Sequence, residues 1–236
     1  MERASPETST RPRLDGDLVR EPGRALMVSA AMLAGVALLA IVVASEVASP
    51  PFLQGLDDAW RRRVLAWPEW TRRLGDLFEL LGSGFVMAPL RIAVAAWLAF
   101  RRRRWDLVAW LLAWLAADLL TFALKPGLAR ARPTPTDPDN PFTSFPSAHA
   151  KTAAQVAIGL VLIATSPWRG RRLGYALALA WVALMALSRT VLDHHWLSDV
   201  VAGSLLGAAC AVGVAAATQR FRDHRARNRR VPQRGG

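Results

Sequence analysis

The sequence predicts an all-α, polytopic membrane protein whose six transmembrane helices form a helical bundle. Hydrophobic residues make up 53% of the 236-residue chain and occur in long uninterrupted blocks. One block, Ala25–Ser45, contains no charged residue, and about 20 apolar residues are enough for a helix to cross a bilayer. The net charge of +12 comes almost entirely from arginines at the ends of the blocks. This placement favours cytoplasmic loops of a membrane protein over a nucleic-acid surface.

A long connector separates the first two predicted spans. The first span covers residues 25–47 and ends before Pro50-Pro51. A polar, amphipathic segment then runs to about residue 76, and its tryptophans suit a position at the membrane interface. These tryptophans are Trp60, Trp67 and Trp70.

The second predicted span, residues 77–100, is interrupted by polar residues and a proline, namely Glu79, Pro89 and Arg91. An arginine at that depth needs a partner or a water-filled cavity. The third span, 105–124, carries Asp118, for which the same reasoning holds. The remaining spans are predicted over residues 147–166, 173–188 and 197–218.

The charged ends of the chain complete the predicted organisation. Residues 1–24 mix five acids with five arginines, which predicts a disordered cytoplasmic tail. Residues 25–218 form the six-span domain, and residues 219–236 form a basic cytoplasmic tail. An even number of spans places both termini on one side. That side carries 19 Lys and Arg residues and the other side 9, which favours cytoplasmic termini.

With this topology, the segments 125–147 and 189–197 share the non-cytoplasmic face, and a group of polar residues falls in or next to them. These residues are Lys125, Arg132, Ser147, His149, Arg189, His195 and Asp199. Cations gathered at one membrane face repel one another unless an anion joins them, and Arg and Lys suit phosphate oxygens. The alternative is that these cations extend separately to the lipid headgroups.

The stretch FPSAHA, residues 145–150, predicts a helix start beside this cluster. Ser147 is a plausible N-cap of the fourth span, and a helix N-terminus attracts anions through its free N–H groups and its dipole. His149 would lie in the first turn and face the same place. A solvated or capping histidine is the simpler interpretation of His149 alone.

The stretch SRTVLDHHWLSD, residues 188–199, contains two adjacent histidines. On a helix, residues four apart share a face, so His195 and Asp199 are expected to meet. A carboxylate on one ring nitrogen leaves the other free to act as a nucleophile or ligand. His194 has only Ser198 at the same spacing, and we assign no role to His194 or Asp193.

We expect no metal and no cofactor at this site. The histidines and aspartates have suitable atoms for zinc or iron, but the surrounding cations oppose a metal ion and no HExxH spacing is present. Cys210 is the only cysteine and lies in the last apolar run. It therefore forms neither an intrachain disulfide nor a cysteine metal site, and we expect it to be a packing residue.

Three stretches together resemble the motifs of the type 2 phosphatidic acid phosphatase superfamily, KxxxxxxRP, PSGH and SRxxxxxHxxxD. Here they read Lys125-x6-Arg132-Pro133, Pro146-Ser147-Ala148-His149 and Ser188-Arg189-x5-His195-x3-Asp199. The resemblance covers Lys125 to Asp199 directly, and the six-span layout extends it over most of the chain. Ala148 departs from the usual glycine, which affects how closely phosphate approaches the backbone.

The resemblance implies a role for each matched residue. His195 would attack phosphorus and form a phosphohistidine, with Asp199 orienting it. His149 would protonate the leaving oxygen and later activate water. The phosphoryl oxygens would be held by four residues: Lys125, Arg132, Ser147 and Arg189. The family uses no metal, and its membrane branch acts on lipid phosphates.

The sequence therefore favours an integral membrane phosphatase in a bacterial inner membrane, acting on a lipid phosphate or diphosphate at the non-cytoplasmic face. Candidate substrates are phosphatidic acid, phosphatidylglycerol phosphate and a polyprenyl diphosphate. Two alternatives stay open. A phosphotransferase would use the same site with an alcohol as acceptor. An anion or lipid-phosphate transporter would bind without turnover, and Arg91 and Asp118 inside spans are features of such proteins.

Overall fold

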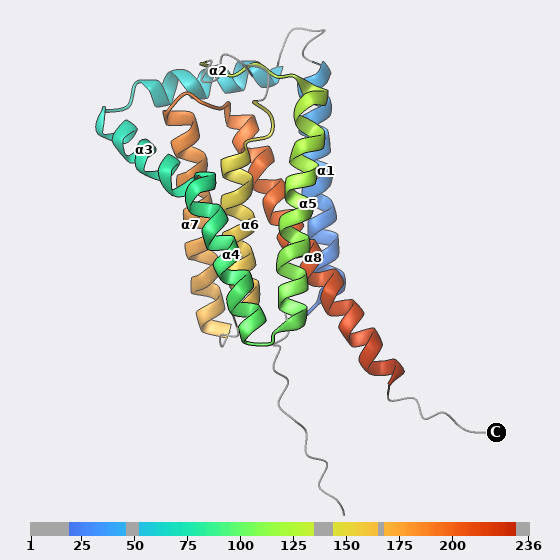
Figure 1. The fold of residues 1–236 in the computed structure, drawn as a ribbon. Coiled ribbons are helices and arrows are strands. Elements are labelled where there is room, and N and C mark those ends of the chain that lie inside the picture. The colour runs from blue at the N-terminus through green and yellow to red at the C-terminus, as the bar shows by residue number, and fades with distance from the viewer. Residues whose placement is uncertain (1–18, 46–51, 135–143, 165–167, 230–236) are drawn as a thin grey trace, which may run out of the picture.

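The structure is a computed structural model that describes residues 19–45, 52–134, 144–164 and 168–229. Over these residues its only regular elements are eight α-helices, which confirms the all-α class (Figure 1). The helices are α1 (Pro22–Ser45), α2 (Phe52–Leu65), α3 (Trp70–Gly82), α4 (Gly84–Phe100), α5 (Arg104–Leu128), α6 (Ala148–Ile163), α7 (Trp168–Val191) and α8 (Leu197–Asn228).

Four of these helices are long and apolar enough to cross a membrane by themselves: α1, α5, α7 over Gly170–Val191, and α8. The consecutive helices α3 and α4 pass the same test as a pair and make a fifth. Helix α6 is apolar but only 16 residues long. The protein is therefore a helical membrane protein, and the count of six spans stays a prediction.

The second predicted span is not one straight helix. Helix α3 begins at Trp70, seven residues before the predicted start, and the chain breaks at Ser83, where the axis bends by 43°. Ser83 has an extended backbone between Gly82 and Gly84, and glycine and serine are poor helix formers that favour caps. The predicted amphipathic connector forms helix α2, which lies across one end of the bundle (Figure 1).

The centre of the bundle is the close crossing of α6 and α8. Most residues of α6 are buried, so this helix is surrounded by protein. A Cβ atom at Gly203 would overlap the carbonyl oxygen of Ser147, and one at Gly207 would overlap that of Lys151. Glycines four apart let two helix backbones approach closely. The close packing of these two α8 glycines therefore fixes the position of the first turn of α6.

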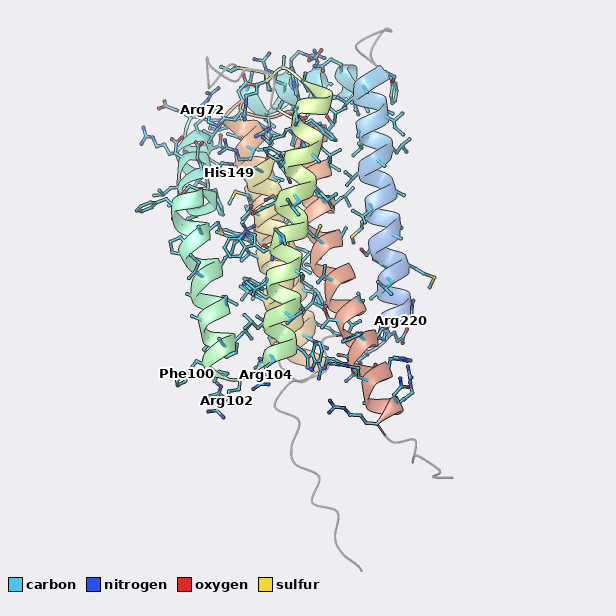
Figure 2. All side chains as sticks on the ribbon, turned by 45° about the vertical axis from the view of Figure 1, so that its right-hand side comes forward. Arg72, Phe100, Arg102, Arg104, His149 and Arg220 are labelled. Carbon is cyan, nitrogen blue, oxygen red and sulfur yellow. The ribbon has the colours of Figure 1, made fainter. Side chains whose placement is uncertain are left out.

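The two ends of the bundle carry different charged and titratable residues. Arg102, Arg104 and Arg220 lie at one end, whereas Arg72 and His149 lie in the opposite half (Figure 2). Helix α8 continues to Asn228, so ten residues of the predicted basic tail are helical. Residues 1–18 and 230–236 of the two predicted tails lie outside the described residues.

Two smaller contacts complete the packing. The Ser29 hydroxyl on α1 donates to the Ala209 carbonyl on α8 at 2.9 Å. Cys210 is buried and unpaired in a cluster with Val36, Ala117 and Leu206. This position is that of a packing residue, as the sequence suggests.

Candidate active site

The candidate active site lies where three segments meet at the α2 end of the bundle. They are the end of α5 with the chain after it, the start of α6, and the turn between α7 and α8. The Thr134 N–H donates to the Asp193 carbonyl at 3.2 Å, and the Ser147 N–H donates to the Asp199 carbonyl at 3.0 Å. The structure thus brings together the described parts of the two segments that the sequence assigned to one face.

His195 and Asp199 form a buried pair, but not on one helix face as the spacing argument assumed. Helix α8 begins at Leu197 with Trp196 as its N-cap, so His195 lies in the preceding turn. The Trp196 N–H donates to Asp199 Oδ2 at 3.0 Å, and His195 Nδ1 lies 3.5 Å from the same oxygen. This separation exceeds a hydrogen bond, and catalytic contacts commonly shorten when substrate binds.

The other ring nitrogen of His195 faces Arg132. Arg132 Nη1 lies 3.3 Å from His195 Nε2 and donates to the His194 carbonyl at 3.1 Å. Burial lowers the pKa of His195 to about 4, with Asp199 opposing the change and the charges of Arg132 and Arg189 adding to it. His195 is therefore neutral at physiological pH, the state in which an imidazole is nucleophilic.

The start of α6 has the predicted capping arrangement. Ser147 is the N-cap, and its hydroxyl accepts from the Ala150 N–H at 3.5 Å. His149 is the second residue of the helix and lies within electrostatic range of Arg189, His195 and Arg132. The helix N-terminus and His149 thus share the site with the predicted nucleophile, as an anion site requires.

Arg189 is held by two partners from different elements. It lies in the last turn of α7, and its Nη2 atom is 2.5 Å from His194 Nδ1. Its Nη1 atom lies 3.0 Å from Glu79 Oε1 on α3. Sequence reasoning gave His194 no role, and the structure shows that it fixes Arg189.

Lys125 is in the last turn of α5 and interacts electrostatically with Arg132, Asp199 and Lys151. The structure therefore gathers all seven predicted site residues at one place. Among the residues that the structure describes, no group of three or more His, Cys, Asp or Glu side chains could hold a metal ion.

Asp193, to which the sequence assigned no role, is buried in the structure. It is 8% exposed and adopts a left-handed backbone with φ of 61°, which aspartate tolerates better than most residues. Its carboxylate accepts from Arg61 Nε at 2.7 Å and Nη2 at 2.6 Å. Burial tends to raise the pKa of Asp193, but the bonds from Arg61 and Thr134 outweigh it and lower that pKa. Asp193 thus ties helix α2 to the turn that carries His195.

Sequence reasoning missed the groups that hold Asp199 from behind. Arg130 Nη1 donates to Asp199 Oδ1 at 2.7 Å, and the Ser144 hydroxyl donates to Asp199 Oδ2. Arg130 Nη2 donates to Asp57 Oδ2 on α2 at 2.6 Å. The only sign of Arg130 in the sequence was its position between two other basic residues, Lys125 and Arg132.

A second charged cluster lies deeper, below the start of α6. Asp118 accepts from Lys151 and lies 3.4 Å from Arg91 Nη1. Arg91 also donates to the Thr152 hydroxyl at 3.2 Å and stacks over the Trp114 ring at 4.9 Å. The ionisable groups inside spans are therefore paired with each other, which favours a structural role over a transport pathway.

An apolar cavity of about 480 Å³ lies between α3 and α7. It reaches Ser188, which precedes Arg189, and Phe78, which precedes Glu79. Trp67 and Trp70 also line it. The predicted membrane-interface tryptophans and the residues that precede Glu79 and Arg189 in the chain thus line one cavity.

The sequence model of the PAP2 superfamily matches residues 106–223, half of the chain. Phosphatidylglycerophosphatase B of Bacillus subtilis (strain 168) is 30% identical over 162 residues, which cover 66% of this chain and 79% of that protein.

Two solved structures share the fold. The first is the crystal structure of a transmembrane PAP2-type phosphatidylglycerolphosphate phosphatase from Bacillus subtilis. It has a TM-score of 0.63 and 24% identity and covers 86% of this chain and 98% of that chain. The second is the crystal structure of Aquifex aeolicus LpxE, with a TM-score of 0.54 and 23% identity, covering 67% of this chain and 94% of that chain.

Proposed function

The chain belongs to the PAP2 superfamily, and on that premise we propose that it is an integral membrane phosphatase that hydrolyses a lipid phosphate or diphosphate. One observation carries the proposal. The neutral imidazole of His195 lies between the Asp199 carboxylate and the Arg132 guanidinium, with Arg189 and His149 in electrostatic range. This arrangement suits attack on a phosphoryl group.

In the proposed first step, His195 Nε2 attacks phosphorus while the bond from phosphorus to the leaving oxygen breaks. His149, protonated when the anionic substrate is bound beside it, gives its proton to that oxygen, which leaves as an alcohol or a phosphate. The Nδ1–H of His195 donates to Asp199, whose negative charge stabilises the positive ring. The product of this step is a phosphohistidine.

In the second step, water attacks the phosphohistidine and His149 takes the proton of that water. The nitrogen–phosphorus bond breaks, inorganic phosphate leaves, and both histidines return to their starting states. Lys125, Arg132, Arg189 and the α6 N-terminus at Ser147 stabilise the charge on the phosphoryl oxygens. No step in this scheme uses a metal ion.

The apolar cavity supports a lipid substrate over a soluble one. Its lining includes Ser188 and Phe78, which precede Arg189 and Glu79 in the chain, so we propose that a hydrocarbon chain lies there while its phosphate meets Arg189. Pockets of 300–1,000 Å³ are typical of small-molecule sites. The named relatives fit this class, since one is a phosphatidylglycerophosphatase. Phosphatidylglycerol phosphate, phosphatidic acid and polyprenyl diphosphate are the substrates to test.

The proposed location is a bacterial inner membrane with the site at the non-cytoplasmic face. Arg102, Arg104 and Arg220 lie at the end opposite to His149 (Figure 2), and arginines favour the cytoplasmic side. Impermeant maleimide should therefore label a cysteine placed at exposed Arg72 in intact cells, but not one placed at Arg102. The reverse pattern would invert the orientation.

The mechanism is tested by phosphate release from the lipid panel in detergent. His195→Ala and His149→Ala should abolish release, whereas exposed His224→Ala should retain it as the matched control. The substrate p-nitrophenyl phosphate has a good leaving group, whose oxygen needs no proton. With this substrate, the first step, transfer of the phosphoryl group with release of p-nitrophenol, should be restored in His149→Ala but not in His195→Ala. EDTA should have no effect and vanadate should inhibit. Full activity of His195→Ala would refute the scheme.

Product analysis separates the remaining alternatives. Labelled phosphate transferred to an added alcohol in preference to water would identify a phosphotransferase. An acid-labile, base-stable label on the wild-type protein would identify the phosphohistidine. Binding of lipid phosphate with neither product would favour the transporter.

A further inference from the structure

A buried chain of charged groups connects helix α2 to the candidate nucleophile. It begins at Asp57 on α2, passes through Arg130 after α5, and ends at Asp199 on α8. Asp57 is 1% exposed, and the side chains of Arg130 and Asp199 are 8% and 0% exposed. Buried charges are retained only where they are paired and hydrogen-bonded.

The two terminal nitrogens of Arg130 and both oxygens of Asp57 have specific partners. Arg130 Nη1 donates to Asp199 Oδ1 and to the Ser198 hydroxyl at 2.6 Å, and Nη2 donates to Asp57 Oδ2 and to Gln54 Oε1 at 3.1 Å. Asp57 Oδ1 accepts the Ser198 N–H at 2.9 Å. Asp57 therefore also caps the first turn of α8, where a carboxylate is favourable.

The geometry gives Arg130 a defined effect on Asp199. With Oδ1 held by Arg130, the carboxylate plane is fixed and Oδ2 is directed to His195 Nδ1, 3.5 Å away. We propose that Arg130 and Asp57 are positioning residues that hold the Asp199 carboxylate against His195, so that helix α2 supports the catalytic centre. This inference rests on the proposed function. Helix α2 lies outside residues 106–223, which match the family.

The first test separates turnover from binding. Arg130→Met should lower kcat by about 100-fold, because small displacements of a reacting group have effects of this size. KM should change little, since the phosphate-holding residues are retained. Asp57→Asn should lower kcat less, and Arg130→Lys should recover part of the loss because it keeps the charge. Exposed Arg63→Met and Asp76→Asn are the matched controls and should behave as wild type.

The second test uses the pH dependence of kcat/KM. Four charged or titratable groups act on His195 from the elements around it: Asp199 on α8, Arg132 after α5, Arg189 on α7 and His149 on α6. Loss of the Arg130 charge leaves Asp199 less compensated, so protonated His195 is stabilised. The ratio of variant to wild-type kcat/KM should then fall at acidic pH. The acidic limb of the pH profile, which protonation of His195 sets, should move to higher pH by about one unit.

Asp57→Asn should move the same limb in the opposite direction, because it removes a negative charge behind Arg130. Opposite shifts distinguish electrostatic positioning from loss of folded protein, because destabilisation of either variant would move the acidic limb in the same direction. In the Arg130→Met background, Asp57→Asn should add no further loss of kcat if it acts through Arg130.

Three outcomes decide the matter. Opposite shifts with a lowered kcat support the inference. Variant profiles that superimpose on wild type after scaling, or kcat values that equal wild type, overturn it while leaving the proposed function intact. Absence of phosphate release by the wild-type protein over the whole lipid panel overturns the proposed function itself, and the inference with it.

Discussion

Arg189 Nη1 lies 3.0 Å from Glu79 Oε1, so a carboxylate from α3 contacts the guanidinium that we assign to phosphate binding. Glu79 is 37% exposed, whereas the Arg189 side chain is 3% exposed. An incoming phosphate therefore meets an arginine that is already paired and a carboxylate that repels it. Helix α3 supplies both this carboxylate and one wall of the apolar cavity.

Glu79→Gln should strengthen inhibition by inorganic phosphate and vanadate by about three- to five-fold, in line with the ~1 kcal/mol of a partly exposed ion pair. The reason is that the substitution removes a negative charge beside the anion. Inhibition constants measured with a soluble substrate test this. Glu69→Gln, whose carboxylate pairs with Arg73 at the surface, is the control. Weaker inhibition in Glu79→Gln would contradict the prediction.

Leu187→Trp should fill the cavity between α3 and α7 and raise KM for dipalmitoyl phosphatidic acid by about tenfold, which corresponds to ~1.4 kcal/mol. Hydrolysis of the dihexanoyl lipid, whose chains are short, should change much less. Leu177→Trp on the exposed side of α7 is the matched control. Equal effects on both lipids would show that the hydrocarbon chain binds elsewhere.

Gly203→Ala should destabilise the protein by about 1–3 kcal/mol, the usual cost of overpacking, because its methyl group would overlap the Ser147 carbonyl. The shift of α6 should also reduce phosphate release, since Ser147 and His149 begin that helix. Gly55→Ala on α2, where no atom lies within 4 Å of the added methyl, provides the comparison. Thermal unfolding in detergent and initial rates measure the two effects. A stable and fully active Gly203→Ala protein would exclude the tight crossing.

Stability should fall as pH is lowered from about 6.5 to about 4, in part because of His195. In this window the unfolded chain binds a proton at this residue and the folded chain, with the pKa of His195 lowered to about 4, does not. The contribution of one such group reaches roughly 3 kcal/mol. As pH is lowered over this range, the thermal unfolding midpoint of His195→Asn should fall less steeply than that of the wild-type protein. Parallel curves for the two proteins would contradict this prediction.

The sequence was informative where chemistry depends on local spacing. Apolar blocks located α1, α5, α6 and α7 to within about five residues at each end, and the three motifs contain the residues that the structure gathers at one end of the bundle. The His195–Asp199 pair was predicted correctly for an incorrect local reason, because His195 precedes α8 and Asp199 reaches back through the N-cap of that helix.

Contacts between distant segments left no comparable signal. Asp57 and Arg130 are 73 residues apart and no spacing rule connects them. Asp57 resembles any other acid on an amphipathic helix, and only folding shows that it is buried. The break at Ser83 was visible as Gly-Ser-Gly, but the apolar composition of residues 77–100 outweighed it in the prediction.

The crossing of α6 and α8 also makes assembly of the site depend on the last described helix. Helix α8 follows the other seven helices that the structure describes, and it carries Asp199 together with the glycines that pack against α6. Without α8, the earlier helices would hold His149 and Arg132 but would lack Asp199, whose carboxylate lies 3.5 Å from His195. The residues gathered at the candidate site therefore come together only when α8 packs against the other described helices.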